Sequence, residues 1–289
     1  MTQESWTIQK LLKWTTEFFF EKKVEAPRLS TEILLAHCLS YPRIQLYTRH
    51  DQPLNQDELA RFRELVKRRA AREPVAYIVG VRDFWSLELA VNPHVLIPRP
   101  ETETLVETAL EILHKDSSGM RVLDLGTGSG AIILALAKER PGNHYTAVDA
   151  SPKALDTARK NAQTHSLTVD FYDGSWFEAV RCLERFDLVV SNPPYISSLD
   201  IPGLQPEVAL YEPVSALDGG YQGMEHLSHI MERAPEHLNP GGWLMLEMGY
   251  DQKELVEEAA NRTEAYINLD FIQDLAGHYR VAKMQRTNP

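Results

Sequence analysis

The stretch Val122–Gly130 reads VLDLGTGSG and sets the fold of the larger part of this 289-residue chain. A short apolar run, expected to form a buried strand over 121–125, leads into glycines that alternate with Thr127 and Ser129. Glycine adopts positive φ and lets the backbone approach a ligand closely, so the pattern is typical of a strand-to-helix turn. The spacing is G-x-G-x-G and differs from the G-x-G-x-x-G of dinucleotide sites. Taken alone, it also fits a plain tight connection.

Outward from this turn, apolar strands and helices alternate along the chain. The expected strands cover 121–125, 144–148, 168–172, 186–191, 243–248, 266–273 and 279–283. The expected helices between them cover 131–138, 152–164, 224–237 and 252–262. Such alternation predicts an α/β domain with a mostly parallel, doubly wound sheet. Ligands of such sheets bind outside the carboxyl ends of the strands.

The first seventy or so residues predict a small helical bundle instead. Thr7, Ser30 and Asn55 each precede or open an apolar helical pattern and are expected to be N-caps. A further short helix is expected near 43–48, and the β-rich region 77–91 predicts a β-hairpin. The expected domains are a helical bundle over 1–73, a hairpin linker over 74–98 and the α/β domain over 99–289.

Composition restricts the class of protein. With 43% hydrophobic and 25% charged residues, the chain has the balance of a soluble globular protein. No apolar run approaches the ~20 residues of a membrane helix, and the start lacks the profile of a signal peptide. A net charge of −11 argues against a protein that grips nucleic acid mainly through its phosphates. Cys38 and Cys182 have no metal-like spacing and fit reduced, buried thiols of a cytoplasmic protein.

Two further strand ends carry groups that suit a nucleoside. Asp149 ends the second expected strand, nineteen residues beyond Gly130, where a carboxylate can accept hydrogen bonds from both ribose hydroxyls. A cap on the helix that follows is an equally good account of Asp149. Trp176 follows the third expected strand, and its face suits stacking on an adenine ring. Packing in the core is the alternative for Trp176.

The fourth expected strand is followed by Asn192-Pro193-Pro194-Tyr195. Proline fixes φ, removes a backbone donor and keeps the preceding residue extended, so this loop is stiff. Its carbonyls and the Asn192 amide are left free to face a ligand. A rigid turn without a ligand is the alternative, but four strand ends with binding groups at one sheet edge favour a site. A nicotinamide-dependent dehydrogenase has no use for the last of these groups.

The order of these motifs resembles the S-adenosylmethionine-dependent methyltransferases, in which an (N/D)-P-P-(Y/F) loop marks enzymes that act on planar nitrogens. Within them, the chain resembles the release-factor glutamine N5-methyltransferases, the PrmC or HemK family. The resemblance runs from about Thr7 to Arg280. The further motifs that carry it are EPVAYI at 73–78, PRPETE at 98–103, EP at 212–213, ALDGG at 216–220, Gly223, and GHYR at 277–280.

This resemblance implies a Rossmann-like class I methyltransferase sheet and an enzyme that uses S-adenosyl-L-methionine. The implied acceptor is the N5 side-chain amide of the glutamine in the Gly-Gly-Gln motif of class 1 peptide-chain release factors. Methylation of this amide is implied to tune translation termination. The implied cofactor-binding residues are Gly126, Thr127, Gly128, Ser129, Gly130, Asp149, Trp176 and Asn192. The implied substrate-binding residues are Asn192, Pro193, Pro194 and Tyr195, of which Asn192, Pro193 and Tyr195 are also implied to be catalytic.

By the same resemblance, the Asn192 side-chain oxygen and the Pro193 carbonyl accept the two N–H bonds of the glutamine amide, and Tyr195 stacks on its plane. An amide nitrogen is a poor nucleophile because its lone pair is delocalised, and two fixed acceptors would orient it and favour its developing charge. The stretch from Arg99 to Glu103 is expected to close the methionine end of the cofactor. Alternatively, Arg99 pairs with Glu101 or Glu103 and supports the helix start. Asp124 is expected to orient the glycine turn.

The N-terminal helices carry no catalytic constellation and are expected to add a second contact with the release factor, which raises its effective concentration. No metal, no direct nucleic-acid binding and no membrane contact are expected, and the chain is expected to be a monomer. The alternatives are an adenine-N6 methyltransferase, which would flip a base, and another nitrogen methyltransferase acting on RNA or ribosomal protein. A non-catalytic adenosylmethionine-binding module is a third alternative, and the intact loop at 192–195 argues against it.

Overall fold

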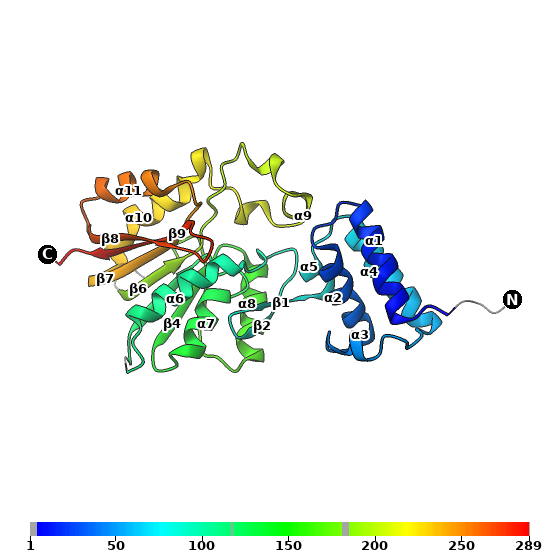
Figure 1. The fold of residues 1–289 in the computed structure, drawn as a ribbon. Coiled ribbons are helices and arrows are strands. Elements are labelled where there is room, and N and C mark those ends of the chain that lie inside the picture. The colour runs from blue at the N-terminus through cyan, green and yellow to red at the C-terminus, as the bar shows by residue number, and fades with distance from the viewer. Residues whose placement is uncertain (1–4, 117, 181–184, 289) are drawn as a thin grey trace. The chain divides into compact units, whose positions relative to one another are not determined.

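The computed structural model describes residues 5–116, 118–180 and 185–288, and the chain divides into two compact units (Figure 1). The helical unit consists of Met1–Gly80 together with Gln205–Tyr211, and the sheet unit of Val81–Leu204 and Glu212–Pro289. A short segment from the second half of the sequence therefore folds with the N-terminal helices. Cys38 is a free, buried thiol, as expected, whereas Cys182 lies outside the described residues.

The helical unit is built from amphipathic helices whose ends follow from local capping. Its helices are α1 (Ile8–Glu21), α2 (Pro27–Leu39), α3 (Gln45–Thr48), α4 (Gln56–Ala70), α5 (Val75–Val79) and α9 (Pro206–Ala209). The Thr7 side chain accepts from the Lys10 N–H, and Asn55 forms a capping box with Glu58, so both expected caps are confirmed. Ser30 is not a cap, because α2 begins at Pro27 and places the Ser30 hydroxyl inside the helix.

A buried ion-pair cluster fastens α9 inside the helical unit. Arg69 Nη1 lies 2.9 Å from Glu207 Oε1, and Arg72 Nη2 lies 2.5 Å from Glu207 Oε2. Arg69 and Glu207 are 3% and 7% exposed, so this pair is shielded from water. The two guanidinium groups lower the pKa of Glu207 against the opposing effect of burial. A buried charge needs such partners, because an unpaired one would be strongly destabilising.

The connection after α4 differs from the expected hairpin. Residues Val75–Val79 form the short helix α5 behind Pro74, and Gly80 ends it with φ of 81°. The hairpin follows as β1 (Val81–Phe84) and β2 (Leu87–Ala90), paired antiparallel. The prediction that the hairpin starts at Tyr77 is therefore wrong. The residues there are β-rich, but Pro74 can open a helix and Gly80 can close it after a single turn.

The sheet unit confirms the α/β fold. Within the described residues its main sheet has seven strands in the order β5-β4-β3-β6-β7-β9-β8. The strands are β3 (Arg121–Leu125), β4 (His144–Asp149), β5 (Asp170–Asp173), β6 (Phe186–Ser191), β7 (Leu238–Glu247), β8 (Tyr266–Gln273) and β9 (Tyr279–Arg286). Strands β3 to β7 pair in parallel, and β9 pairs antiparallel with both β7 and β8.

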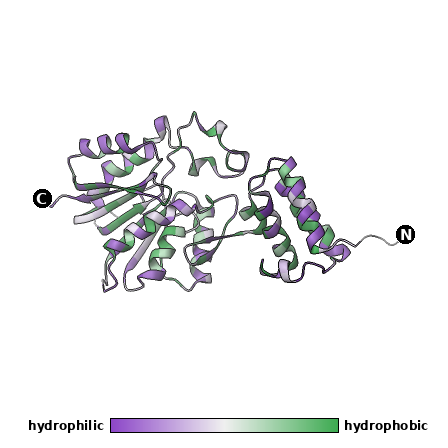
Figure 2. Cartoon of the chain, viewed as in Figure 1, coloured by the Kyte–Doolittle hydropathy of each residue, from purple (hydrophilic) through white to green (hydrophobic). Residues whose placement is uncertain are grey.

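Helices cover both faces of this sheet. The helices are α6 (Glu103–Ile112), α7 (Ala131–Glu139), α8 (Pro152–Thr164), α10 (Glu225–His237) and α11 (Lys253–Arg262), and 3-10 turns occupy Pro100–Thr102, Ile201–Gly203, Val214–Ala216 and Tyr221–Gly223. Most of these helices carry hydrophilic residues beside hydrophobic ones, as amphipathic helices do (Figure 2), whereas α7 is apolar and buried from Ala131 to Ala137.

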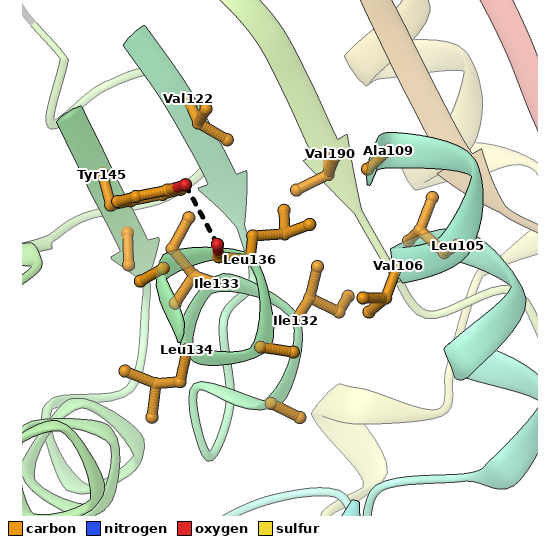
Figure 3. Close-up of a cluster of buried hydrophobic side chains, with 14 of the residues drawn as sticks. Leu105, Val106, Ala109, Val122, Ile132, Ile133, Leu134, Leu136, Tyr145 and Val190 are labelled. Carbon is orange, nitrogen blue, oxygen red and sulfur yellow. Dashed lines mark hydrogen bonds between the residues drawn. The ribbon is translucent and has the colours of Figure 1, made fainter. Parts of the chain in front are cut away.

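Alternate residues of each strand face opposite layers. Val122 and Val190 pack in one cluster with α6 and α7, where the Tyr145 hydroxyl donates to the Leu136 carbonyl at 3.0 Å (Figure 3). Leu123 and Val189 pack in the other cluster, with α10 and α11. This alternation is the period-2 geometry of a strand buried on both faces.

The order of the strands fixes where a ligand can bind. From β3 the chain winds outward through β4 to β5, and it then returns to β6, on the other side of β3, and continues to β7. The carboxyl ends of β3 and β6 therefore meet at a switch point, where a crevice opens in doubly wound sheets. In the part of the chain that the structure describes, no helix is long and apolar enough to cross a bilayer.

Candidate active site

A cavity of about 640 Å³ opens at the carboxyl edge of the sheet, within the sheet unit. Its lining comes from the ends of β3, β4 and β6, from the turn after β5, and from segments 94–102 and 213–226. The expected site residues that line it are Gly126, Thr127, Gly128, Ser129, Asp149, Trp176, Asn192 and Pro194. Gly130, Pro193 and Tyr195 do not line it. The volume is that of a pocket for a small molecule.

The glycine turn after β3 is held from below by Asp124. The Thr127 hydroxyl donates to Asp124 Oδ2 at 2.6 Å. Asp124 is fully buried, and burial raises its pKa to about 7. Gly130, with φ of 85°, is the N-cap of α7, and a Cβ there would lie 2.9 Å from Leu134 Cδ1. Gly130 therefore serves the close packing of turn and helix, while Gly126 to Ser129 face the cavity.

Asp149 lies at the end of β4 with both carboxyl oxygens already engaged by the backbone. Oδ2 accepts from the Gly128 N–H at 2.8 Å and Oδ1 from the Ser151 N–H at 2.9 Å. Burial raises the pKa of Asp149, and these two donors lower it in part. Each oxygen keeps a second lone pair for a ligand hydroxyl. The capping alternative is wrong, because Ser151 is the residue that caps α8.

Trp176 lies beside the glycine turn. Its ring would be 3.5 Å from a Cβ placed on Gly126, whose φ is 71°, and it contacts the His226 ring at a centroid distance of 5.2 Å. The residue lines the cavity and also packs against the core cluster of α10 and α11. The packing of Trp176 in the core is therefore confirmed in part, while its stacking on an adenine ring stays a prediction. A flat aromatic surface facing the cavity suits a planar ligand ring.

The loop at 192–195 lies next to this turn because β6 pairs with β3. The Asn192 Nδ2 group donates to the Thr102 hydroxyl at 3.2 Å, and both residues line the cavity. At the residue before Asn192, the Ser191 hydroxyl donates to the Leu125 carbonyl at 2.7 Å. This hydrogen bond links the ends of β6 and β3. The loop is thus fixed at its start, with the Asn192 side chain at the cavity wall.

Tyr195 is held from outside the cavity. Its hydroxyl donates to Glu247 Oε1 at 3.1 Å, and its carbonyl accepts from Gln252 Nε2 at 2.9 Å. The Gln252 side chain is fixed in turn, because its Oε1 accepts from the Gly249 N–H at 2.8 Å. Gln252 is buried, so this amide acts as a clamp on the loop backbone. The aromatic ring of Tyr195 therefore packs against the core, beside the cavity wall.

Arg99 has a different partner from those expected. It lines the cavity and pairs with the buried Glu212, with Nη2 2.5 Å from Oε1. The second Glu212 oxygen accepts from the Ile97 N–H at 3.1 Å. Glu103 accepts from the Trp85 N–H instead, so the expected pairing of Arg99 with a neighbouring glutamate is wrong. Glu212 therefore ties the segment before Pro100 to the cavity wall at 213–216.

Sequence reasoning missed Glu247 and Gln252 as parts of the site, and it placed Thr102 in the expected closing stretch at 99–103 without foreseeing its hydrogen bond with Asn192. Glu247 carried a usable signal, since an acidic residue that closes an apolar strand is also what singled out Asp149. Thr102 and Gln252 carried none, because their roles depend on contacts across the fold. Among the described residues, no group of His, Cys, Asp and Glu side chains is arranged to hold a metal ion.

Comparisons with known proteins agree with this arrangement. Residues 10–80 match the family model described as the PrmC N-terminal domain, and residues 116–286 match a methyltransferase domain. A release factor glutamine methyltransferase from Geobacter sulfurreducens is 49% identical, and the match covers 90% of each chain. One from Vibrio cholerae is 44% identical over 95% of each chain.

A comparison with a solved structure supports the fold of the sheet unit. A methyltransferase from Pyrococcus furiosus superposes with a TM-score of 0.52 at 21% identity, covering 71% of this chain and 91% of that one. At that identity the likeness concerns the fold alone, and the fold is the same class of sheet. The sequence matches reach further, because they span both units at more than 40% identity. The chain belongs to the release factor glutamine methyltransferase family.

Proposed function

We propose that this chain transfers a methyl group from S-adenosyl-L-methionine to the side-chain amide of the glutamine in the Gly-Gly-Gln motif of class 1 release factors. The observation that carries the proposal is the position of Asn192. Its side chain lies at the cavity wall beside the glycine turn, with Nδ2 already bound by Thr102. The carboxamide oxygen of Asn192 is therefore the group left to accept from an incoming N–H.

The described residues fit the cofactor. Gly126 to Ser129 would hold the methionyl and ribose part, where no Cβ of Gly126 or Gly128 obstructs the approach. The spare lone pairs of Asp149 suit the ribose hydroxyls, and Trp176 offers a flat surface for adenine. When bound, the cofactor would supply a methyl group on a sulfonium: a nitrogen lone pair can attack that methyl carbon, and the C–S bond breaks to leave a neutral thioether.

The loop at 192–195 would prepare the acceptor. The Asn192 oxygen at the cavity wall would accept one N–H of the glutamine amide, and the carbonyl of Pro193, which itself does not line the cavity, would accept the other. These two bonds would aim the nitrogen lone pair and stabilise positive charge on the nitrogen. Pro194 lines the cavity and would contact the amide, while Tyr195 supports the loop from behind. No strong base is required, because the proton can leave to water after the nitrogen is alkylated.

We extend the proposal to the helical unit as a second contact with the release factor. Trp14, Phe20 and Tyr47 are 50%, 76% and 52% exposed, and each is a large aromatic side chain that a protein partner could cover. A partner in translation termination would also place the chain in the cytoplasm, as a monomer that meets its substrate there. Phe20→Ser should then raise KM for intact release factor and leave the rate on a short Gly-Gly-Gln peptide unchanged. Equal KM values for the intact protein would remove this contact.

The decisive experiment compares methyl acceptors. The full chain is incubated with methyl-labelled cofactor and either purified release factor or duplex DNA, and the labelled residue is identified by mass spectrometry. Label on the glutamine of the Gly-Gly-Gln motif supports the proposal. Label on adenine of DNA, with none on the release factor, would overturn it and favour an adenine-N6 methyltransferase.

A further inference from the structure

The turn between β8 and β9 contains the motif at 277–280, to which the proposed function assigns no role. One carboxylate organises this turn. Asp274 Oδ1 accepts from the Ala276 N–H at 2.9 Å and from the His278 N–H at 3.0 Å. Its Oδ2 accepts from Arg280 Nε at 3.0 Å. Asp274 therefore fixes both the turn and the direction of the Arg280 guanidinium group.

Strand pairing brings Arg280 close to the loop at 192–195. Ser191, which ends β6, is opposite Leu246 of β7, and the Met248 N–H donates to the Arg280 carbonyl of β9 at 2.9 Å. The strands β6, β7 and β9 are neighbours in that order (Figure 1). Neighbouring strands lie about 4.8 Å apart, so the Arg280 backbone lies roughly 10 Å from the start of the loop.

Tyr250, His278 and Arg280 form an open surface at this end of β7 and β9. Tyr250 is 60% exposed, and its ring centre lies 5.5 Å from that of His278 and 5.8 Å from Arg280 Cζ. His278 is exposed as well. Among the described residues, the Tyr250 hydroxyl and the two Nη groups of Arg280 have no hydrogen-bond partner. An exposed aromatic ring beside a guanidinium group is a combination that protein-binding surfaces favour.

This surface lies on the side of the loop away from the proposed cofactor site. The cofactor would occupy the edge over β3, β4 and β5, whereas the surface lies over β7 and β9, with β6 and its loop between them. A glutamine side chain that meets the methyl group at the loop therefore has room for its main chain over β7 and β9. An extended chain advances about 3.3 Å per residue, so about three residues span the distance from the loop to Arg280.

We propose that Tyr250 and Arg280 bind the main chain of the two glycines that precede the substrate glutamine, with His278 supporting the Tyr250 ring. This inference rests on the proposed function. Glycine has no side chain to recognise, so its recognition must use peptide groups. The Arg280 Nη groups donate to peptide carbonyls, and a peptide plane packs flat on the Tyr250 ring, which a residue without Cβ can approach closely.

The first variants change Tyr250, whose exposure and unpaired hydroxyl make its replacement harmless to the fold. Tyr250→Ala should raise KM about tenfold, both for intact release factor and for a short Gly-Gly-Gln peptide. Tyr250→Phe keeps the ring and should have a KM close to that of wild type. The value of kcat should stay unchanged, because these contacts are equally strong before and during methyl transfer.

The second variant is Arg280→Gln, with Lys283→Gln as its matched control. Arg280→Gln should raise KM for both acceptors about tenfold or more, the effect of losing hydrogen bonds from a charged donor. Lys283 lies on the same strand, over the Trp243 ring at 5.7 Å, and its replacement should leave KM unchanged. Calorimetry should show the same dissociation constant of S-adenosylmethionine for all variants, and thermal unfolding should show that they are folded.

A KM raised for both acceptors in Tyr250→Ala and Arg280→Gln, and in neither control, supports the inference. An unchanged KM in Tyr250→Ala would overturn it. A rise for intact release factor alone would also overturn it, because the surface would then bind a part of the partner other than the two glycines. Failure of the proposed function is distinguishable, since the wild-type chain would then methylate neither acceptor.

Discussion

At the scale of single residues, Asn192 is the side chain on which the chemistry depends. It lies at the cavity wall and donates to Thr102 through Nδ2, so its oxygen is the side-chain group that can accept from a substrate amide. Asn192→Ala should raise the activation free energy by roughly 2–4 kcal/mol, the scale for losing one preorganised polar contact. Steady-state kinetics with release factor measures this effect.

Asn192→Asp is the matched control for this prediction. It keeps an oxygen acceptor at the same place, replaces the donor to Thr102 by a second acceptor oxygen and adds a negative charge, so the loss of kcat should still be smaller than for Asn192→Ala, which has no acceptor. Thermal unfolding should show that both variants are folded. Near-normal turnover in Asn192→Ala would refute the assigned role.

How much of the site the sequence could reveal depends on how local each contact is. Asp149, Trp176 and Asn192 follow directly on strand ends, so the pattern of strands was enough to bring them to one edge. The contacts of Glu247 with Tyr195 and of Glu212 with Arg99 could not be predicted, because they join positions distant in sequence, although Glu247 ends an apolar strand as Asp149 does and Glu212 belongs to a motif of the family resemblance. Only strand pairing and the path of the loop create those contacts, and no local spacing encodes them.

At the scale of elements, glycines allow the segment at 196–223, which follows the loop at 192–195, to pack closely against that loop. Ile196 bridges to Asp218, and a Cβ on Gly223 would lie 2.0 Å from the Tyr195 carbonyl oxygen. Gly223 also has φ of 70°, which L side chains rarely adopt. Gly223→Ala should therefore displace the loop, lower kcat and reduce the free energy of unfolding by about 1–3 kcal/mol.

Gly203→Ala is the control within the same segment. A Cβ on Gly203 would meet nothing within 4 Å, and its φ is not positive. Activity and stability should change little, within about 0.5 kcal/mol. Equal effects of the two substitutions on kcat and on urea unfolding would show that the close approach of Gly223 does not matter. The elements themselves were largely predictable, and the short α5 was missed because one helical turn has too little periodicity to recognise.

At the scale of the whole molecule, the buried cluster of Glu207 with Arg69 and Arg72 should govern the stability of the helical unit. Glu207→Gln leaves the guanidinium of Arg69, which is 3% exposed, without its counter-ion. Removing one partner of a buried pair costs about 3–5 kcal/mol. Glu64→Gln breaks only the exposed pair with Lys67 and should cost less than about 1 kcal/mol. Urea unfolding monitored by helical circular dichroism separates the two, and equal midpoints would contradict the prediction.

The free energy of unfolding should depend on pH through two buried carboxyl groups, those of Asp124 and Glu247. Burial raises the pKa of Asp124 and of Glu247 to about 7, above their ordinary values of 3.8 and 4.5. Their stabilising contribution is therefore complete below those ordinary values and is lost as the pH rises through about 7. Glu247→Gln removes one of them, so its free energy of unfolding relative to wild type should increase by about 3 kcal/mol from pH 5 to pH 8. A constant difference across that range would contradict the shift.

The assignment of Gln205–Tyr211 to the helical unit has a consequence for how the protein is made. Synthesis runs from the N-terminus, so the helices up to Gly80 leave the ribosome long before Glu207 exists. Until then Arg69 and Arg72 lack the carboxylate that neutralises them. The first unit to be translated therefore cannot be the first to be finished. It must wait, partly assembled, for a short stretch that is delivered more than a hundred residues later, from between the sequences that build the sheet.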